Sequence, residues 1–252
     1  MRLVLGNERR TRWLFHLVRH LRCALVVLLA CMTTGFGQHP MSLFSPKDIK
    51  STPSDIEQIA IPFLPLEHYP LLSKFKQVKT VSFYSTDGTG ASDEKLEALA
   101  KNENQHLKDI TLLNCPLVTD GGIRHISTIT ALRMLQLEGT SITDEALEII
   151  SSKMRLTGLN ISNCPKVTMK GLLKLATSET LKEFGFSAND LSQEDVVRLI
   201  NEFRTITWCG IVDPSEKLDA QVLKILGKEK GVRVVIKRTG ALQDVKKARG
   251  GR

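Results

Sequence analysis

The sequence predicts an α/β solenoid, in which a curved parallel sheet forms one face and short helices form the other. Between Leu107 and Asn189 the pattern apolar-x-x-apolar-x-apolar occurs four times, with starts 25, 24 and 25 residues apart. Each copy is followed by an apolar pair at helical spacing. One such unit cannot bury its own apolar face, so neighbouring units must stack into a continuous core. The strand positions are Leu107, Ile110 and Leu112; Leu132, Leu135 and Leu137; Leu156, Leu159 and Ile161; and Leu181, Phe184 and Phe186. The helix pairs are Ile123 and Ile126, Leu147 and Ile150, Leu172 and Leu175, and Val197 and Ile200.

Each strand pattern leads to a turn position that we expect to be buried. This position lies eight residues after the start of the repeat. There an Asn or Thr side chain can hydrogen-bond backbone groups of the adjoining turn. We predict that these residues form a structural ladder along the core: Cys115, Thr140, Cys164 and Asn189.

A second motif lies at the start of each predicted helix. Val118-Thr119-Asp120 recurs as Ile142-Thr143-Asp144, and in shorter form as Val167-Thr168 and Leu191-Ser192. The run from Leu107-x-x-Ile110-x-Leu112 through Cys115 to Ile123 resembles the cysteine-containing subclass of leucine-rich repeats, whose periods fall in the range of about 20–29 residues. The resemblance covers Leu107–Ile200 and implies a binding scaffold, although a fold alone does not specify a ligand.

The repeats continue outward in weaker form. Together these patterns predict a leucine-rich-repeat domain over residues 71–236, with about six or seven coils. The outer strand positions are Val78, Val81 and Phe83 before the four clear repeats, Phe203, Ile206 and Trp208 after them, and a closing strand at 232–236.

Residues 38–70 contain six prolines and little periodicity, and we expect them to form an N-terminal cap or linker. Two local structures remain open here. Ser54-Asp55-Ile56-Glu57 has the spacing of a helix capping box. Alternatively, Ile56, Ile59 and Ile61 form a degenerate repeat strand.

Residues 1–37 have the composition of a signal peptide or lipoprotein signal. Six arginines and one acid surround a short apolar run at 24–30, which small and polar residues follow. The run is shorter than the roughly 20 apolar residues of a membrane span. Cleavage is expected either after Gly37 or before Cys31, which would then carry a lipid. An uncleaved anchor and an arginine-rich organelle transit peptide are the alternatives.

The positive charge lies at the two ends of the chain. Residues 1–37 and 237–252 each have a net charge of +5, which leaves −2 for the residues between them, out of +8 overall. The repeats therefore offer no basic stripe for phosphate groups, and we expect no nucleic-acid partner. Residues 237–252 are predicted to form a basic, disordered tail.

The cysteines do not predict a disulfide. Cys115 and Cys164 are two repeats apart, which at about 4.8 Å per strand separates their Cα atoms by roughly 10 Å. This exceeds the limit of about 7 Å for a disulfide, so we expect two buried, reduced thiols. Cys209 is expected on the exposed face, without the cationic neighbour that a nucleophile needs.

Side chains between the inward strand positions should lie on the open side of the sheet, the usual ligand surface of this architecture. The acids among them suit a basic partner, although scattered solvated acids are the alternative. Tyr84, Leu113 and Met134 would supply an apolar anchor. The expected partner contacts are Tyr84, Asp109, Thr111, Leu113, Met134, Gln136, Glu138, Asn160 and Glu183.

No residue pattern supports catalysis. Asp109 and Glu138 fall in different columns of the sheet, with no His or Ser arranged beside them. Gly88 and Gly90 follow a predicted strand but lack the further residues of a phosphate-binding loop. The histidines, cysteines and acids do not form a set of metal ligands. We therefore expect no enzyme activity, no cofactor and no metal.

These observations predict a monomeric, non-catalytic protein that is exported to the periplasm, the cell surface or the medium. It would bind a protein or peptide through its concave sheet face and contact a membrane only through its signal segment or a lipid anchor. The alternative is an intracellular adaptor that resembles the substrate receptors of ubiquitin ligases. Those receptors have an N-terminal helical adaptor-binding module, for which residues 38–70 are too short and too rich in proline.

Overall fold

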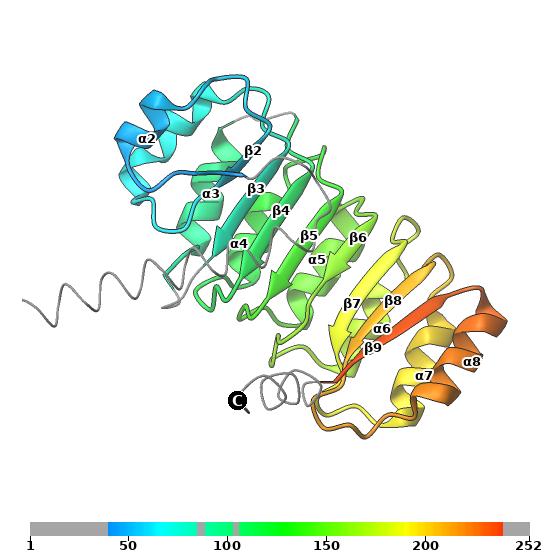
Figure 1. The fold of residues 1–252 in the computed structure, drawn as a ribbon. Helices are drawn as coiled ribbons and strands as arrows, with labels where there is room; N and C mark the ends of the chain where they lie inside the picture. The colour runs from blue at the N-terminus through cyan, green and yellow to red at the C-terminus, as the bar shows by residue number, and fades with distance from the viewer. Residues whose placement is uncertain (1–39, 85–88, 103–105, 239–252) are drawn as a thin grey trace, which may run out of the picture.

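The computed structural model describes residues 40–84, 89–102 and 106–238. Within these ranges nine strands form one all-parallel sheet, and their order in the sheet is their order in the sequence. Figure 1 shows helices α3 to α8 on one side of this sheet. The predicted fold class, an α/β solenoid of the leucine-rich-repeat type, is confirmed. The elements are β1 (Met41–Ser42), α2 (Pro46–Ser51), β2 (Gln58–Ala60), η1 (Leu66–Lys74), β3 (Thr80–Tyr84), α3 (Asp93–Lys101), β4 (Asp109–Leu113), α4 (Asp120–Ile126), β5 (Met134–Glu138), α5 (Asp144–Lys153), β6 (Gly158–Asn160), α6 (Met169–Leu175), β7 (Glu183–Ser187), α7 (Gln193–Glu202), β8 (Trp208–Val212), α8 (Ala220–Lys230) and β9 (Arg233–Lys237).

The strands form because every second side chain is apolar and can be buried on the helix side. In β4, Ile110 and Leu112 are buried while the residues beside them are half-exposed. The pairing brings Ile110 next to Leu135, then Leu159, then Phe184 on successive strands. Each such side chain contributes about 1.5–3 kcal/mol by leaving water. The core is thus a set of apolar rows that run across the coils.

A left-handed residue after the strand creates the buried turn position. Its positive φ interrupts the alternation of side chains, so that the next residue points inward. Cys115, Thr140 and Cys164 are buried there, as predicted. The Thr140 hydroxyl donates to the Leu137 carbonyl oxygen at 2.9 Å, and the Cys164 thiol donates to the same oxygen at 3.0 Å. The left-handed residues are Asn114 (φ 54°), Gly139 (φ 70°) and Asn163 (φ 56°).

The prediction for Asn189 was wrong. Ala188, with 2% of its surface exposed, is the buried residue of that turn, and Asn189 is only half-buried. The preceding residues have no left-handed φ, so the alternation of β7 simply continues from Phe186 to Ala188.

Three aspartates bind each coil to the next, and we call them the aspartate ladder: Asp93, Asp120 and Asp144. Each is the first residue of its helix and accepts hydrogen bonds from the N-cap threonine of the following helix. Asp120 accepts from the Thr143 backbone N–H at 2.8 Å, from the Thr143 hydroxyl at 2.7 Å and from the Ala146 N–H at 3.2 Å. Each threonine hydroxyl also accepts a helix N–H, so it caps its own helix. The Thr-Asp motif is therefore a connection between coils.

The aspartate ladder stops at α6, where Met169 occupies the position of the aspartate. The next N-cap residue, Ser192, is instead bonded by Asp195 of its own helix in a capping box. At the following junction Gln193 accepts a single hydrogen bond from the Asp219 N–H at 2.9 Å.

The structure decides between the two local structures left open for residues 38–70. No helix begins at Ser54, because Gln58–Ala60 forms strand β2 with Ile59 and Ile61 buried, as the alternative of a degenerate repeat predicts. The capping box lies earlier, at Ser45 and Asp48 of α2. The sheet starts at Met41, so strands of the solenoid already lie within the predicted cap.

The expected signal segment at 1–37, the lipidation candidate Cys31 and the tail from residue 239 lie outside the described residues. In the part of the chain that the structure describes, no helix is long and apolar enough to cross a membrane.

Replacing Asp120 with Ala should lower the free energy of unfolding by about 2–3 kcal/mol, because it removes three hydrogen bonds to a carboxylate. Glu148→Ala is the matched control, since it removes an exposed acid from α5, and it should change stability by less than about 0.5 kcal/mol. Urea unfolding followed by circular dichroism measures both. Equal stability of the two variants would show that the aspartate ladder does not bind the coils together.

Candidate functional site

The side of the sheet opposite the helices is the candidate site, and we call it the open sheet face. The strand register aligns its side chains in columns, one residue from each strand. The first column, from β3 to β8, contains Thr80, Asp109, Met134, Gly158, Glu183 and Trp208; the second contains Ser82, Thr111, Gln136, Asn160, Gly185 and Gly210; the third contains Tyr84, Leu113, Glu138, Ser187 and Val212.

The structure brings most of the predicted contacts together on this face. All of them except Tyr84 are half-exposed or exposed, and they lie on the neighbouring strands β4 to β7: Asp109, Thr111, Leu113, Met134, Gln136, Glu138, Asn160 and Glu183. Tyr84 is different, because only 7% of its surface is exposed. The expectation that Tyr84 supplies an exposed anchor was therefore wrong.

The predicted register of β8 was wrong by three residues, because the repeat starts at Ile206 and not at Phe203, and this reverses which side chains of β8 face the open side. Trp208 is half-exposed on the open sheet face, whereas Cys209 is buried opposite Phe184. Both residues are apolar, so the local pattern allowed either one to point inward. The repeat length decides between them, since Ile206 lies 25 residues after Leu181 and makes Cys209 and Ile211 the inward positions. Trp208 is thus a site residue that the pattern had assigned to the core.

Two large apolar side chains on the open sheet face lie over glycines. The six-membered ring of Trp208 covers Gly210, where an added Cβ would come within 2.3 Å of the ring. Met134 extends over Gly158 of the next strand, where a Cβ would meet its sulfur at 2.3 Å. Any larger residue at Gly158 or Gly210 would displace these side chains from the sheet.

The Asn160 side chain makes structural hydrogen bonds on the same face. Its Oδ1 accepts the Ser162 backbone N–H at 3.0 Å and the Ser162 hydroxyl at 2.7 Å. The same oxygen lies above Gly185, where a Cβ would approach it to 2.9 Å. The side-chain oxygen of Asn160 therefore fixes the end of its own strand.

The open sheet face is acidic from β3 to β8. Its columns there contain Asp109, Glu138 and Glu183 but no Lys or Arg. Burial raises the pKa of Asp109, although the Thr80 hydroxyl, which donates to this carboxylate at 3.2 Å, and the nearby charge of Lys108 partly offset that effect. A charged Asp109 on this face therefore has an unfavourable desolvation energy.

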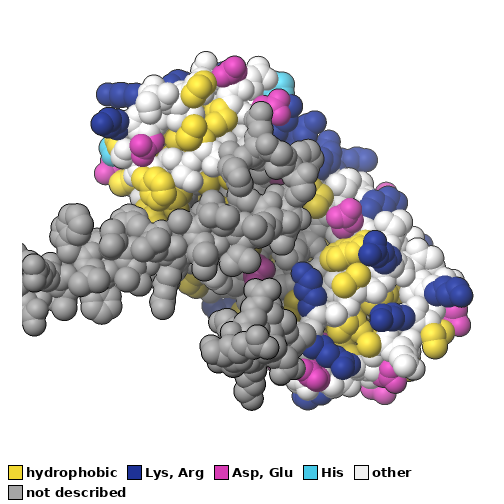
Figure 2. Space-filling model, viewed as in Figure 1, with side chains coloured by type: hydrophobic (Ala, Val, Ile, Leu, Met, Phe, Trp, Pro, Cys, Tyr) yellow, Lys and Arg dark blue, Asp and Glu magenta, His cyan; other side chains and the backbone are white. Residues whose placement is uncertain are grey.

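Basic groups lie at the C-terminal end of the molecule. Arg233 and Lys237 are exposed on β9, and Lys224 and Lys228 are exposed on α8. Figure 2 shows the Lys and Arg side chains over these C-terminal coils. The acidic strands of the open sheet face are thus bounded on one side by a basic edge.

The described residues show few groups suited to nucleophilic catalysis or metal binding. Burial raises the pKa of Cys115 to about 11 and that of Cys209 to about 12, and it also raises the pKa of Cys164. Such thiols are poor nucleophiles near neutral pH. Within the described ranges, no three His, Cys, Asp or Glu side chains converge on a point where a metal could bind.

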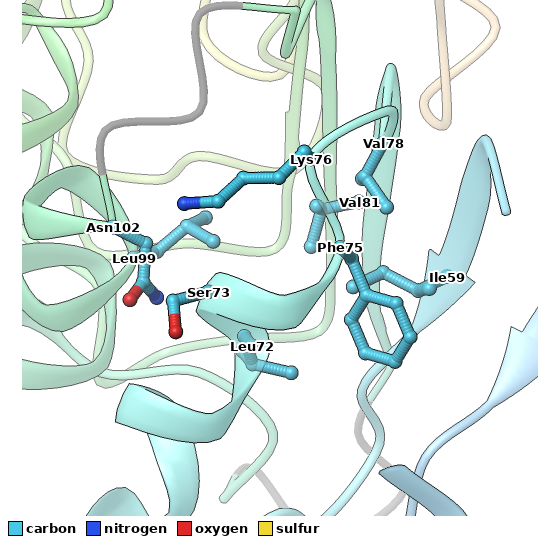
Figure 3. Close-up of a pocket in the computed structure, with 9 residues that line it drawn as sticks. All are labelled: Ile59, Leu72, Ser73, Phe75, Lys76, Val78, Val81, Leu99 and Asn102. Carbon is cyan, nitrogen blue, oxygen red and sulfur yellow. The ribbon is translucent and has the colours of Figure 1, made fainter. Parts of the chain in front are cut away.

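A small cavity lies beneath η1, away from the open sheet face. Figure 3 shows that Ser73, Lys76 and Asn102 provide the polar side chains of its lining and that the other side chains are apolar. Its volume of about 10 Å³ is enough for roughly one water molecule. It is too small to hold a cofactor or a metabolite.

No protein-family model and no curated protein matches the chain. Among solved structures, the chain is similar to the tropomodulin C-terminal domain of Caenorhabditis elegans, with 17% sequence identity and a TM-score of 0.42. The similarity covers 55% of this chain and 90% of that domain. At these values it says nothing about a ligand, and the fold rests on the strand order and register described above.

The register of β8 can be tested through thiol reactivity. In a variant with Cys23→Ser and Cys31→Ser, the three remaining thiols, Cys115, Cys164 and Cys209, are buried and should react with a thiol reagent only after unfolding. Because burial disfavours the thiolate of Cys209, the folded protein should remain unreactive up to about pH 9. Rapid labelling of one thiol per folded molecule, assigned to Cys209 by mass spectrometry, would restore the register with Cys209 outward.

Proposed function

We propose that this chain is a non-catalytic scaffold that binds a protein or peptide on the open sheet face between β4 and β8. The observation that carries this proposal is Trp208, an aromatic side chain that lies half-exposed at the end of a row of partly exposed contacts. Tryptophan is enriched among the residues that dominate protein–protein binding energies.

The form of the surface favours a polypeptide over the other classes of ligand. Parallel strands hold the side chains at fixed positions about 4.8 Å apart, so several contacts can be made without loss of backbone entropy. The small cavity under η1 cannot enclose a metabolite. Acids on the face repel nucleic-acid phosphates. A protein segment that lies across the strands is the ligand class that suits this surface best.

The cysteine-containing subclass of repeat fits two of the turn positions. Cys115 and Cys164 occupy equivalent buried turns, and Thr140 fills the same place between them. A thiol and a hydroxyl of similar size suit this position, because both donate to a nearby strand carbonyl.

The binding surface can be located by photo-crosslinking in the native cells. A benzophenone amino acid at Gln136, on the open sheet face, should capture a partner protein, and the product should be lost when Trp208→Ala is added. The same amino acid at Lys153, exposed at the end of α5, is the control and should give no product. Thermal unfolding checks that the Trp208→Ala variant is folded. Capture from Lys153 but not from Gln136 would place the partner elsewhere.

The proposal includes export, with residues 1–37 as a signal that is cleaved after Gly37 or lipidated at Cys31. The arginine-rich flank and the apolar run at 24–30 support it. The intact mass and N-terminal sequence of the protein from its native cells provide the test. A start at Gln38 or a lipid on Cys31 is the expected result. An intact Met1 in a soluble fraction would instead favour the intracellular adaptor.

A further inference from the structure

We infer that the segment bound on the open sheet face is basic, and that one of its Arg or Lys side chains packs on the Trp208 ring beside Glu183. This inference rests on the proposed function and names the chemistry of the partner. It comes from the pairing of an exposed aromatic ring with an acid on the neighbouring strand, on a face whose strands β3 to β8 contribute no cation of their own.

Trp208 and Glu183 lie directly side by side. They are paired in register on β7 and β8, so their Cα atoms are about 4.8 Å apart in the first column. The ring is drawn down over Gly210 and remains half-exposed. A cation above an indole ring is attracted by its π-electrons, and an adjacent carboxylate adds to that attraction.

Glu183 is available for such a contact. It is exposed, and no Lys or Arg among the described residues forms an ion pair with it. Arg233 is the cation of this chain nearest to Trp208 along the first column, since it is paired with Trp208 on β9. It lies on the side of Trp208 away from Glu183, about two strand spacings from that carboxylate.

The other acids set the spacing that the segment should have. Asp109 shares the first column with Glu183 but lies three strands away, on β4. Three strand spacings are about 14 Å, which an extended chain covers in about four residues. A segment that crosses the strands can therefore place one basic residue at Glu183 and a second, four positions along, at Asp109.

Charge complementarity identifies the occupant as a basic segment, which we assign to another protein; the basic residues 239–252 of this chain are the competitor to be tested. Three full-length samples separate them: the protein with Trp13→Phe, in which Trp208 is the only tryptophan; the same protein with Glu183→Gln; and the same protein with Glu179→Gln. Glu179 is exposed before β7 and outside the columns of the open sheet face, so its variant controls for the change in net charge.

Two peptides of equal length serve as probes, with either Arg or Glu at every fourth position between Gly and Ser. The Arg peptide should bind and protect Trp208 fluorescence from quenching by acrylamide. Glu183→Gln should weaken its binding about five- to tenfold, and Glu179→Gln should weaken it less than twofold. A third peptide, with the same arginines placed consecutively, should bind less tightly than the spaced one.

The inference would be overturned by equal binding of the Glu peptide, by equal effects of the two Glu variants, or by no protection of Trp208. One of these results could occur while the residue at Gln136 still crosslinks to a partner. The partner would then lie on this face without being basic, and the proposed function would hold although this inference failed. Truncation after Arg238 should leave the affinity for the Arg peptide unchanged. A tenfold gain on truncation would identify the tail of this chain as the occupant.

Discussion

Every coil must bring its strand back to the sheet in register with the strand before it, and the rest of the structure depends on this constraint. Parallel strands place equivalent residues of successive repeats side by side, as in the row from Ile110 through Leu135 and Leu159 to Phe184. This row excludes water only if each coil closes at the same position. The same constraint aligns the polar side chains on the other side of the sheet. Core and binding surface are therefore two consequences of one register.

Repetition made most of the fold predictable, and the errors occurred where one local pattern fitted two structures. Trp208 and Cys209 are both apolar, and only the length of the coil decides which is buried. Asn189 matched the ladder position by count, but the left-handed turn that buries that position is missing before it. Tyr84 alternates correctly, yet it is buried. Contacts distant in sequence cannot be derived from the spacing of a single repeat. The expected contacts on β4 to β7 could be placed, and a strict count of the 25-residue coil length would have placed Trp208 on the same face.

The candidate site retains a charge that weakens the fold. Because burial raises the pKa of Asp109, the folded state favours the protonated carboxyl. The resulting loss of stability is present at neutral pH and disappears as the pH falls below the ordinary value for aspartate. Thr80 offsets part of it through one hydrogen bond. Residues that reduce stability are tolerated where a surface serves a ligand, because the core keeps the free energy of unfolding above the level that folding requires.

The end of the aspartate ladder at Met169 divides the described solenoid into two parts. From α3 to α6 each coil is fastened to the next by a carboxylate, whereas α7 is capped by its own Asp195. The strand pairing is short here as well, since β6 pairs with β5 and with β7 over three residues each, while β7 pairs with β8 over five. The end of the ladder therefore separates a first block, whose helices α3 to α6 it joins, from a second block that begins with α7. Asp109 and Glu138 lie on the first block, and Glu183 and Trp208 lie on the second. A ligand that touches both blocks would span the junction where the ladder ends and would fasten together coils that no aspartate of the described solenoid joins.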